Sequence, residues 1–146
     1  MTDIFNARQL LDHLVSFPTV SSDTNLPLIY FVRDYFADHG IGSVVIPNED
    51  GTKAGLVAQV GPNVAGGVAL SGHSDVVPVE GQDWITDPWT VVEKDDRLYG
   101  RGTCDMKGFV ALAMAAMVKA KSMDLQRPLQ FALSRDEEVG LLGAPD

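Results

Sequence analysis

The chain has a single cysteine among its 146 residues, so an internal disulfide cannot form. Its longest apolar stretch, residues 109–118, is too short to cross a bilayer. The first residues lack the basic segment and apolar run that mark a signal peptide. These absences predict a protein of the reducing cytoplasm, with no membrane partner.

Clustered positive charge is also lacking. Eleven Lys and Arg side chains stand against twenty Asp and Glu side chains, which gives a formal net charge of −9. Such a balance disfavours binding to nucleic acid or to an anionic membrane. The excess of acid is interpreted as an aid to solubility, with attraction of cationic substrates as the alternative, and a bound metal ion would neutralise part of it.

Length and composition indicate one soluble globular domain, or part of one. Hydrophobic residues make up 45% of the chain and charged residues 21%, both close to globular averages. A chain of 146 residues can bury one substantial core but falls short of two ordinary domains.

Hydrophobic periodicity predicts two amphipathic helices in the first part of the chain. The first begins at a capping box formed by Asn6 and Gln9 and ends as Pro18 approaches. The second begins near Asn25 and ends at Gly40, because glycine readily adopts the positive φ of a helix terminus. Both helices are interpreted as structural.

Short β-rich runs follow. Residues 43–46, 55–60 and 67–71 are predicted to be neighbouring strands of one sheet, and a hairpin is predicted over residues 91–99. A largely apolar helix over residues 107–121 then leads to a strand at 129–134. Strand, buried helix and strand make a βαβ crossover, which implies parallel pairing and helices on both faces. We therefore expect an α/β fold: a three-layer domain with a mixed, largely parallel sheet flanked by helices.

Residues of metal-ligand type recur at equal spacing along the chain. Asp105 follows His73 by 32 residues, and Glu137 follows Asp105 by another 32. Each lies near the end of a predicted strand or in a loop, where sites of α/β sheets form. An imidazole and several carboxylates brought together would repel and be desolvated at a cost, unless a cation held them. The pattern therefore predicts a metal site.

The donor types indicate which ion would bind. Imidazole with carboxylates suits Zn²⁺ or a similar first-row ion, whereas an all-oxygen set would suit Mg²⁺ or Ca²⁺. On an extended segment His73 and Asp75 point to the same face, so Asp75 can accept the second ring N–H and orient the imidazole. Asp105 lies in a Gly-rich loop, where its two oxygens could bridge two ions.

The adjacent acids Glu137 and Glu138 are predicted to have different roles, because neighbours on an extended backbone point to opposite faces. One could bind the ion while the other removes a proton from a water and later protonates the leaving amine. Taken singly, these residues have structural explanations, since Asp105 could cap a helix and the glutamates could favour a helix start. Their joint occurrence at strand ends favours the functional interpretation.

Other chemistry-bearing side chains are interpreted as structural. His13 lies on a predicted helix surface and His39 beside a helix terminus. Cys104 is expected to pack as a small residue, because no second cysteine accompanies it. Trp84 and Trp89 could line a pocket or cover the hairpin.

Four segments, at residues 71–79, 87–89, 98–108 and 134–140, resemble one known family in order and spacing. They are similar to the co-catalytic zinc aminoacylase/carboxypeptidase family, which includes acetylornithine deacetylase, succinyl-diaminopimelate desuccinylase and aminoacylase. Within that family, residues 77–82 and 101–109 look most like acetylornithine deacetylase.

The resemblance implies a zinc-peptidase-like fold with two Zn²⁺ ions per full-length subunit, for which Co²⁺ could substitute. It implies His73 as a terminal ligand, Asp105 as the bridge and Glu138 as a ligand of the other ion. Glu137 is implied as the general acid and base, and Asp75 as the residue that orients His73. The peptide bond after Asp105 is expected to be cis.

The implied reaction is removal of the acetyl group from N-acetylornithine, a step of arginine biosynthesis. One alternative is a desuccinylase, aminoacylase or dipeptidase of the same family, and another is an inactive module with partial metal binding. The expected partner is a small N-acyl amino acid, and the full-length enzyme is expected to be a homodimer. The family's later carboxylate and histidine ligands have no counterpart here. We therefore expect residues 1–146 to form an incomplete, amino-terminal part of the catalytic domain, with the dimerisation domain and the carboxyl-terminal part absent.

Overall fold

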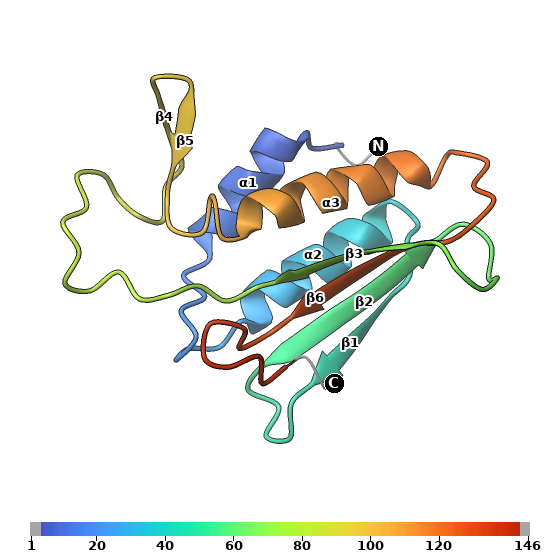
Figure 1. Ribbon diagram of the computed structural model, residues 1–146, viewed down its shortest axis with the longest axis horizontal. Coiled ribbons are helices and arrows are strands. Elements are labelled where there is room, and N and C mark those ends of the chain that lie inside the picture. Colours follow the sequence, from blue (N-terminus) through green and yellow to red (C-terminus); the bar gives the residue numbers. More distant parts are fainter. Residues whose placement is uncertain (1–3, 144–146) are drawn as a thin grey trace.

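The computed structural model of the protein describes residues 4–143. The helices and strands expected from the sequence are present (Figure 1). Their bounds are α1 (Ala7–Ser16), α2 (Leu26–Asp38), β1 (Ser43–Pro47), β2 (Ala54–Val60), β3 (Val68–His73), β4 (Val92–Lys94), β5 (Arg97–Tyr99), α3 (Lys107–Ala120) and β6 (Leu129–Ser134).

Local sequence determines where helix α1 begins and ends. The Asn6 side chain accepts the backbone N–H of Gln9, and the Gln9 side chain accepts the backbone N–H of Asn6, both at 2.9 Å. This predicted capping box satisfies two donors that a helix start leaves free. The helix ends before Pro18, and it buries Leu10 and Leu14 completely.

The main sheet has the strand order β1-β2-β6-β3 (Figure 1). The parallel pairing of β3 with β6 confirms the expected βαβ crossover through α3. The other two pairings, β1 with β2 and β2 with β6, are antiparallel. The sheet is therefore mixed, as expected, but among the described strands it is not largely parallel. A short turn over residues 48–53 joins β1 to β2, and so brief a connection permits only antiparallel pairing.

The described helices cover one face of this sheet. Helices α2 and α3 contact its strands, and α1 packs on α3. Phe36 of α2 meets Phe131 of β6 edge to face, with ring centroids 5.2 Å apart. The opposite face leaves Val44 and Val57 exposed. The predicted layer of helices on the second face is therefore not found within residues 4–143, and β2 has the alternating burial of a strand covered on one side.

Helix α3 runs over the sheet from the site end of β3 toward the start of β6 (Figure 1). It buries Val110, Met114 and Met117, while Leu112 on its outer side is exposed. No helix in the described part of the chain is long and apolar enough to span a membrane.

Candidate metal centre

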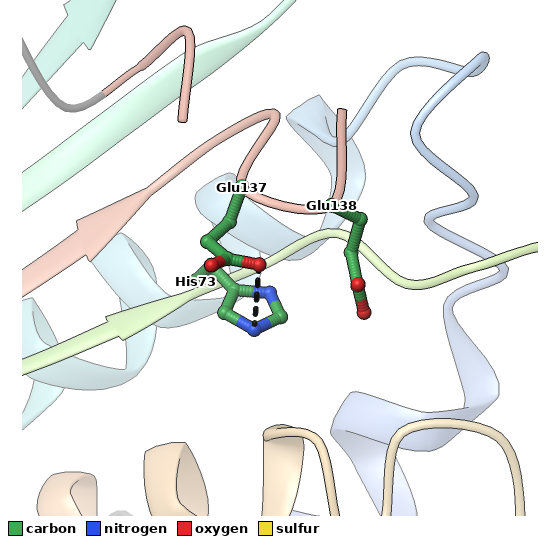
Figure 2. A group of neighbouring side chains, drawn as sticks. All are labelled: His73, Glu137 and Glu138. Atoms are coloured by element: carbon green, nitrogen blue, oxygen red, sulfur yellow. Dashed lines mark ion pairs between the residues drawn. The ribbon is translucent and has the colours of Figure 1, made fainter. Parts of the chain in front are cut away.

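The predicted site residues meet at the carboxyl ends of β3 and β6. His73 is the last residue of β3 and pairs with Ser134, the last residue of β6. Because the two strands are parallel neighbours, the loop after β6 begins beside His73. Figure 2 shows Glu137 and Glu138 extending from that loop on the same side as the imidazole ring.

The imidazole of His73 is the centre of the cluster. One ligand atom each from His73, Glu137 and Glu138 lies within 4.8 Å of the other two. Nε2 of His73 is 3.7 Å from Oε2 of Glu137 (Figure 2) and 3.0 Å from Oδ1 of Asp105. Asp105 comes from the loop before α3, and its side chain is 73% exposed. Three segments distant in sequence therefore converge, as the spacing predicted.

The carboxylate of Asp75 is buried beside this cluster. It accepts hydrogen bonds from Oγ of Ser21 at 2.6 Å and from the backbone amides of Glu137 and Glu138 at 3.1 and 3.2 Å. Nδ1 of His73 is 2.9 Å from the backbone carbonyl oxygen of Asp75 and 3.6 Å from its carboxylate. The ring therefore faces both the carbonyl and the carboxylate of Asp75, and the carboxylate also holds the turn that carries the two glutamates.

That turn departs from the extended backbone assumed in the sequence analysis. Asp136 has a φ of 54°, in the left-handed region, and redirects the chain so that two successive amides face Asp75. The two side chains still reach different surroundings. Glu137 lines a cavity of about 390 Å³ with His73, whereas Glu138 lines one of about 230 Å³ with Asp105.

Burial and close charges shift the protonation of these groups. Burial lowers the pKa of His73, but hydrogen bonds with Asp75 and Asp105 outweigh burial and raise the pKa to about 9. Burial alone would raise the pKa of Asp75, but the bonds from His73, from Ser21 and from the turn amides hold it well below its usual range. Burial, and then the charge of Asp105, raises the pKa of Glu138. A divalent cation would compete with the bound protons.

The donor set fits zinc. One imidazole nitrogen with several carboxylate oxygens is a combination that Zn²⁺ accepts. His73 can offer Nε2, because its Nδ1 lies against the carbonyl of Asp75. Asp105, Glu137 and Glu138 can offer oxygens. The bridging role of Asp105 and the division of roles between Glu137 and Glu138 stay predictions.

Two basic side chains, the buried Lys107 and the partly exposed Arg101, hold the loop that carries Asp105. Nζ of Lys107 donates to the backbone carbonyl of Phe17 at 2.7 Å, which ties the start of α3 to the end of α1. Arg101 donates to the carbonyl of Pro78 at 3.2 Å, and its guanidinium lies 5.2 Å from the ring of Trp84. The peptide bond after Asp105 is cis, as expected.

The two other histidines lie apart from the cluster, whereas Cys104 lines the smaller cavity with Asp105 and Glu138. His13 stacks between the rings of Phe5 and Phe31, and Nδ1 of His39 lies 2.7 Å from the carbonyl oxygen of Tyr35, so both have structural contacts. Cys104 is exposed, so its predicted packing role is wrong. The loop that carries Cys104 and Asp105 leaves both side chains exposed.

Three residues around the site were missed by sequence reasoning: Ser21, Lys53 and Asp136. Ser21 and Lys53 lie in loops with no motif around them. Asp136 immediately precedes the glutamate pair, and this adjacency is the only signal that could have identified it.

The chain is similar to known metal-dependent peptidases. Residues 69–146 match the model of Peptidase family M20/M25/M40. Human carnosine dipeptidase 1 has 26% sequence identity and a TM-score of 0.77, over 94% of this chain and 33% of that chain. An M20 family metallo-carboxypeptidase from Sulfolobus solfataricus has 19% identity and a TM-score of 0.81, over 96% and 33%. A dipeptidase from Saccharomyces cerevisiae has 23% identity and a TM-score of 0.65, over 94% and 33%. The chain thus spans about a third of the length of these structures.

Proposed function

Because the chain belongs to the M20/M25/M40 peptidase family of metallohydrolases, we propose that it carries the metal centre of a cytoplasmic, zinc-dependent amide hydrolase. The proposed reaction removes the acetyl group from N-acetylornithine in arginine biosynthesis. One observation carries the proposal: His73, Asp105, Glu137 and Glu138 converge at the ends of two parallel strands.

His73, Asp105 and Glu138 would hold two Zn²⁺ ions per full-length subunit, with Co²⁺ as a substitute. When bound, zinc would lower the pKa of a water and polarise the carbonyl of the scissile amide. The two oxygens of Asp105 allow one residue to serve both ions. Asp75 fixes the imidazole through its backbone carbonyl and the glutamates through its carboxylate.

Glu137 would move the proton. Its carboxylate lies 3.7 Å from His73 and lines the larger of the two cavities at the site, where a substrate could reach it. A carboxylate in this position can take a proton from the attacking water and return it to the leaving amine. The hydrogen bond that its backbone N–H donates to the carboxylate of Asp75 would keep it in place.

The lining of the cavity beside Glu137 supports the proposal of an uncharged acyl group. The cavity holds about 390 Å³, and small or apolar residues such as Gly72, Met106 and Leu133 make up much of its wall. Among the described residues, no Lys or Arg lines it. A succinyl group would bring a second carboxylate into this cavity without a partner, at a desolvation cost. This supports acetyl over succinyl.

A dipeptidase is the second candidate. Two of the similar structures are dipeptidases, and one of them, human carnosine dipeptidase 1, shares 26% identity with this chain. The two candidates share the same metal centre and differ in the group beyond the scissile amide.

A substrate panel on the zinc-loaded full-length protein tests the proposal. We expect kcat/KM for N-acetylornithine to exceed that for an N-succinyl amino acid, another N-acetyl amino acid and a dipeptide. Glu137→Gln is the control for background hydrolysis. Preference for the dipeptide would favour the second candidate, and zinc binding without turnover of any substrate would indicate an inactive binding module. Sedimentation of the same sample tests the proposed homodimer.

A further inference from the structure

Lys53 lies outside every segment that carries the family resemblance, yet it reaches the site. It precedes β2, in the turn after β1, and its side chain is only 17% exposed. Its Nζ donates to Oδ1 of Asp136 and, at 2.6 Å, to the backbone carbonyl of Ser21. A buried ammonium with two acceptors is fixed in position, because losing either partner would leave a buried polar group unpaired.

Asp136, the partner of Lys53, lies in the turn that carries Glu137 and Glu138, so the ion pair acts on the backbone of that turn. Its side chain is 7% exposed, and its other oxygen accepts from Nη1 of Arg135 at 2.9 Å. Its left-handed φ of 54° sets the direction in which Glu137 and Glu138 leave β6. Aspartate adopts this conformation more readily than most residues, but still at some cost, so contacts that fix its side chain help to keep the turn in this form. The contact with Lys53 supplies part of that constraint.

Ser21 links Lys53 to the carboxylate of Asp75. Its carbonyl accepts from Lys53, and its Oγ donates to Oδ2 of Asp75 at 2.6 Å. The carboxylate of Asp75 in turn accepts the amides of Glu137 and Glu138. Starting from Lys53, a continuous path thus runs through Ser21 and Asp75 to the turn, and a second runs through Asp136 to the same turn.

We propose that Lys53 is a positioning residue for the metal centre. Its ammonium holds Asp136 and the Ser21 loop together, which keeps both turn amides on Asp75 and keeps the carboxylates of Glu137 and Glu138 near His73. This assignment rests on the proposed function where it treats those two carboxylates as ligand and base. The competing explanation is an ordinary buried ion pair that stabilises the whole fold evenly.

Amide hydrogen exchange separates the two explanations without metal or substrate. In the metal-free, ¹⁵N-labelled chain, Lys53→Met should accelerate exchange at the amides of Glu137 and Glu138 by about 10-fold or more, corresponding to the loss of roughly one hydrogen bond. The amides of Phe131 and Leu133 in β6 should change far less. Lys53→Arg should restore slow exchange, and Lys94→Met, at an exposed lysine, is the matched control. An even acceleration across β6 and the turn, or none at the turn, would overturn the proposal.

The zinc affinity of the full-length protein, measured by competition with a chromophoric chelator, is the second readout. Lys53→Met should weaken zinc binding by about 10-fold or more, within the range of second-sphere effects, and Lys53→Arg should recover most of it. If the full-length wild type binds no zinc while Lys53→Met still frees the two turn amides, the proposed function fails and the positioning assignment stands. If the wild type binds zinc and Lys53→Met changes neither amide exchange nor zinc affinity, the positioning assignment of Lys53 fails and the proposed function stands.

Discussion

Nε2 of His73 lies 3.0 Å from Oδ1 of Asp105, although 32 residues separate them in sequence. The same nitrogen faces Glu137 at 3.7 Å. Asp105 and Glu137 could bind a cation, and without one they favour a proton on the imidazole. A metal ion and a proton therefore compete for Nε2 of His73.

Zinc affinity should consequently depend strongly on pH. The pKa of His73 is raised to about 9, and zinc binds the neutral imidazole. Below that pKa, each unit of pH should change the apparent affinity by about tenfold, so binding should strengthen about 100-fold from pH 6 to pH 8. Competition titrations at constant ionic strength measure this slope. An affinity that is flat over this interval would contradict the assignment of His73 as a ligand.

The metal-free chain should show the opposite trend in its stability. The pKa of His73 is about 9 in the folded chain, above its value of about 6.5 in an unfolded one. The folded state therefore binds the extra proton, and this contribution is complete below pH 6.5 and lost as pH rises through 9. Urea unfolding with a chelator present should show a stability advantage of wild type over His73→Gln at pH 6 that shrinks by pH 9. Lys107, whose pKa burial lowers to about 7, affects both proteins alike and cancels in the difference.

The sequence predicted those parts of the site and fold that depend on local pattern. The capping box at Asn6 and the bounds of the helices follow from a few neighbouring residues. The convergence of His73 with Glu137 follows from one βαβ unit, because both lie at its strand ends. The order of strands could not be read in the same way, since nothing local to β6 says that it inserts between β2 and β3.

Contacts made through the backbone escaped prediction for a related reason. The carboxylate of Asp75 faces His73 at 3.6 Å, as expected, but its hydrogen bonds with the backbone amides of Glu137 and Glu138 were not predicted, because a sequence does not show which backbone groups meet. Lys53 was missed because its partners come from two distant loops. Such contacts can be identified only from the three-dimensional arrangement of the loops.

Substitutions of Glu137 and Glu138 should have different effects, because the two residues are proposed to have different functions. Glu137→Gln in the full-length enzyme should lower kcat by about 100-fold or more with metal content nearly unchanged, because it removes the proton acceptor. Glu138→Gln should instead reduce bound metal. Elemental analysis beside steady-state kinetics measures both effects. Loss of metal from Glu137→Gln with full occupancy in Glu138→Gln would show that the roles are reversed.

Asp75→Asn should weaken zinc binding by about 10–100-fold without abolishing it, as substitutions behind a ligand do. Asparagine offers one acceptor oxygen, so the amides of Glu137 and Glu138 cannot both keep their present partners. His73→Ala, which removes a ligand, should be more severe. Zinc titrations of the two variants give the comparison, and equal losses would make Asp75 itself a ligand.

Gly108→Ala should disturb the loop that carries Asp105. A Cβ at this position would lie far inside normal contact with the backbone carbonyl oxygen of Thr103, so the loop must shift. We expect a loss of about 1–3 kcal/mol in the free energy of unfolding, the range found for overpacking, together with weaker zinc binding. Gly42→Ala is the matched control, because its Cβ would meet no atom within 4 Å. That control should stay within about 0.5 kcal/mol of wild type. Urea unfolding and zinc titration of both variants measure the effect. Equal stability and equal affinity in the two would mean that the Thr103 carbonyl moves freely and does not position Asp105.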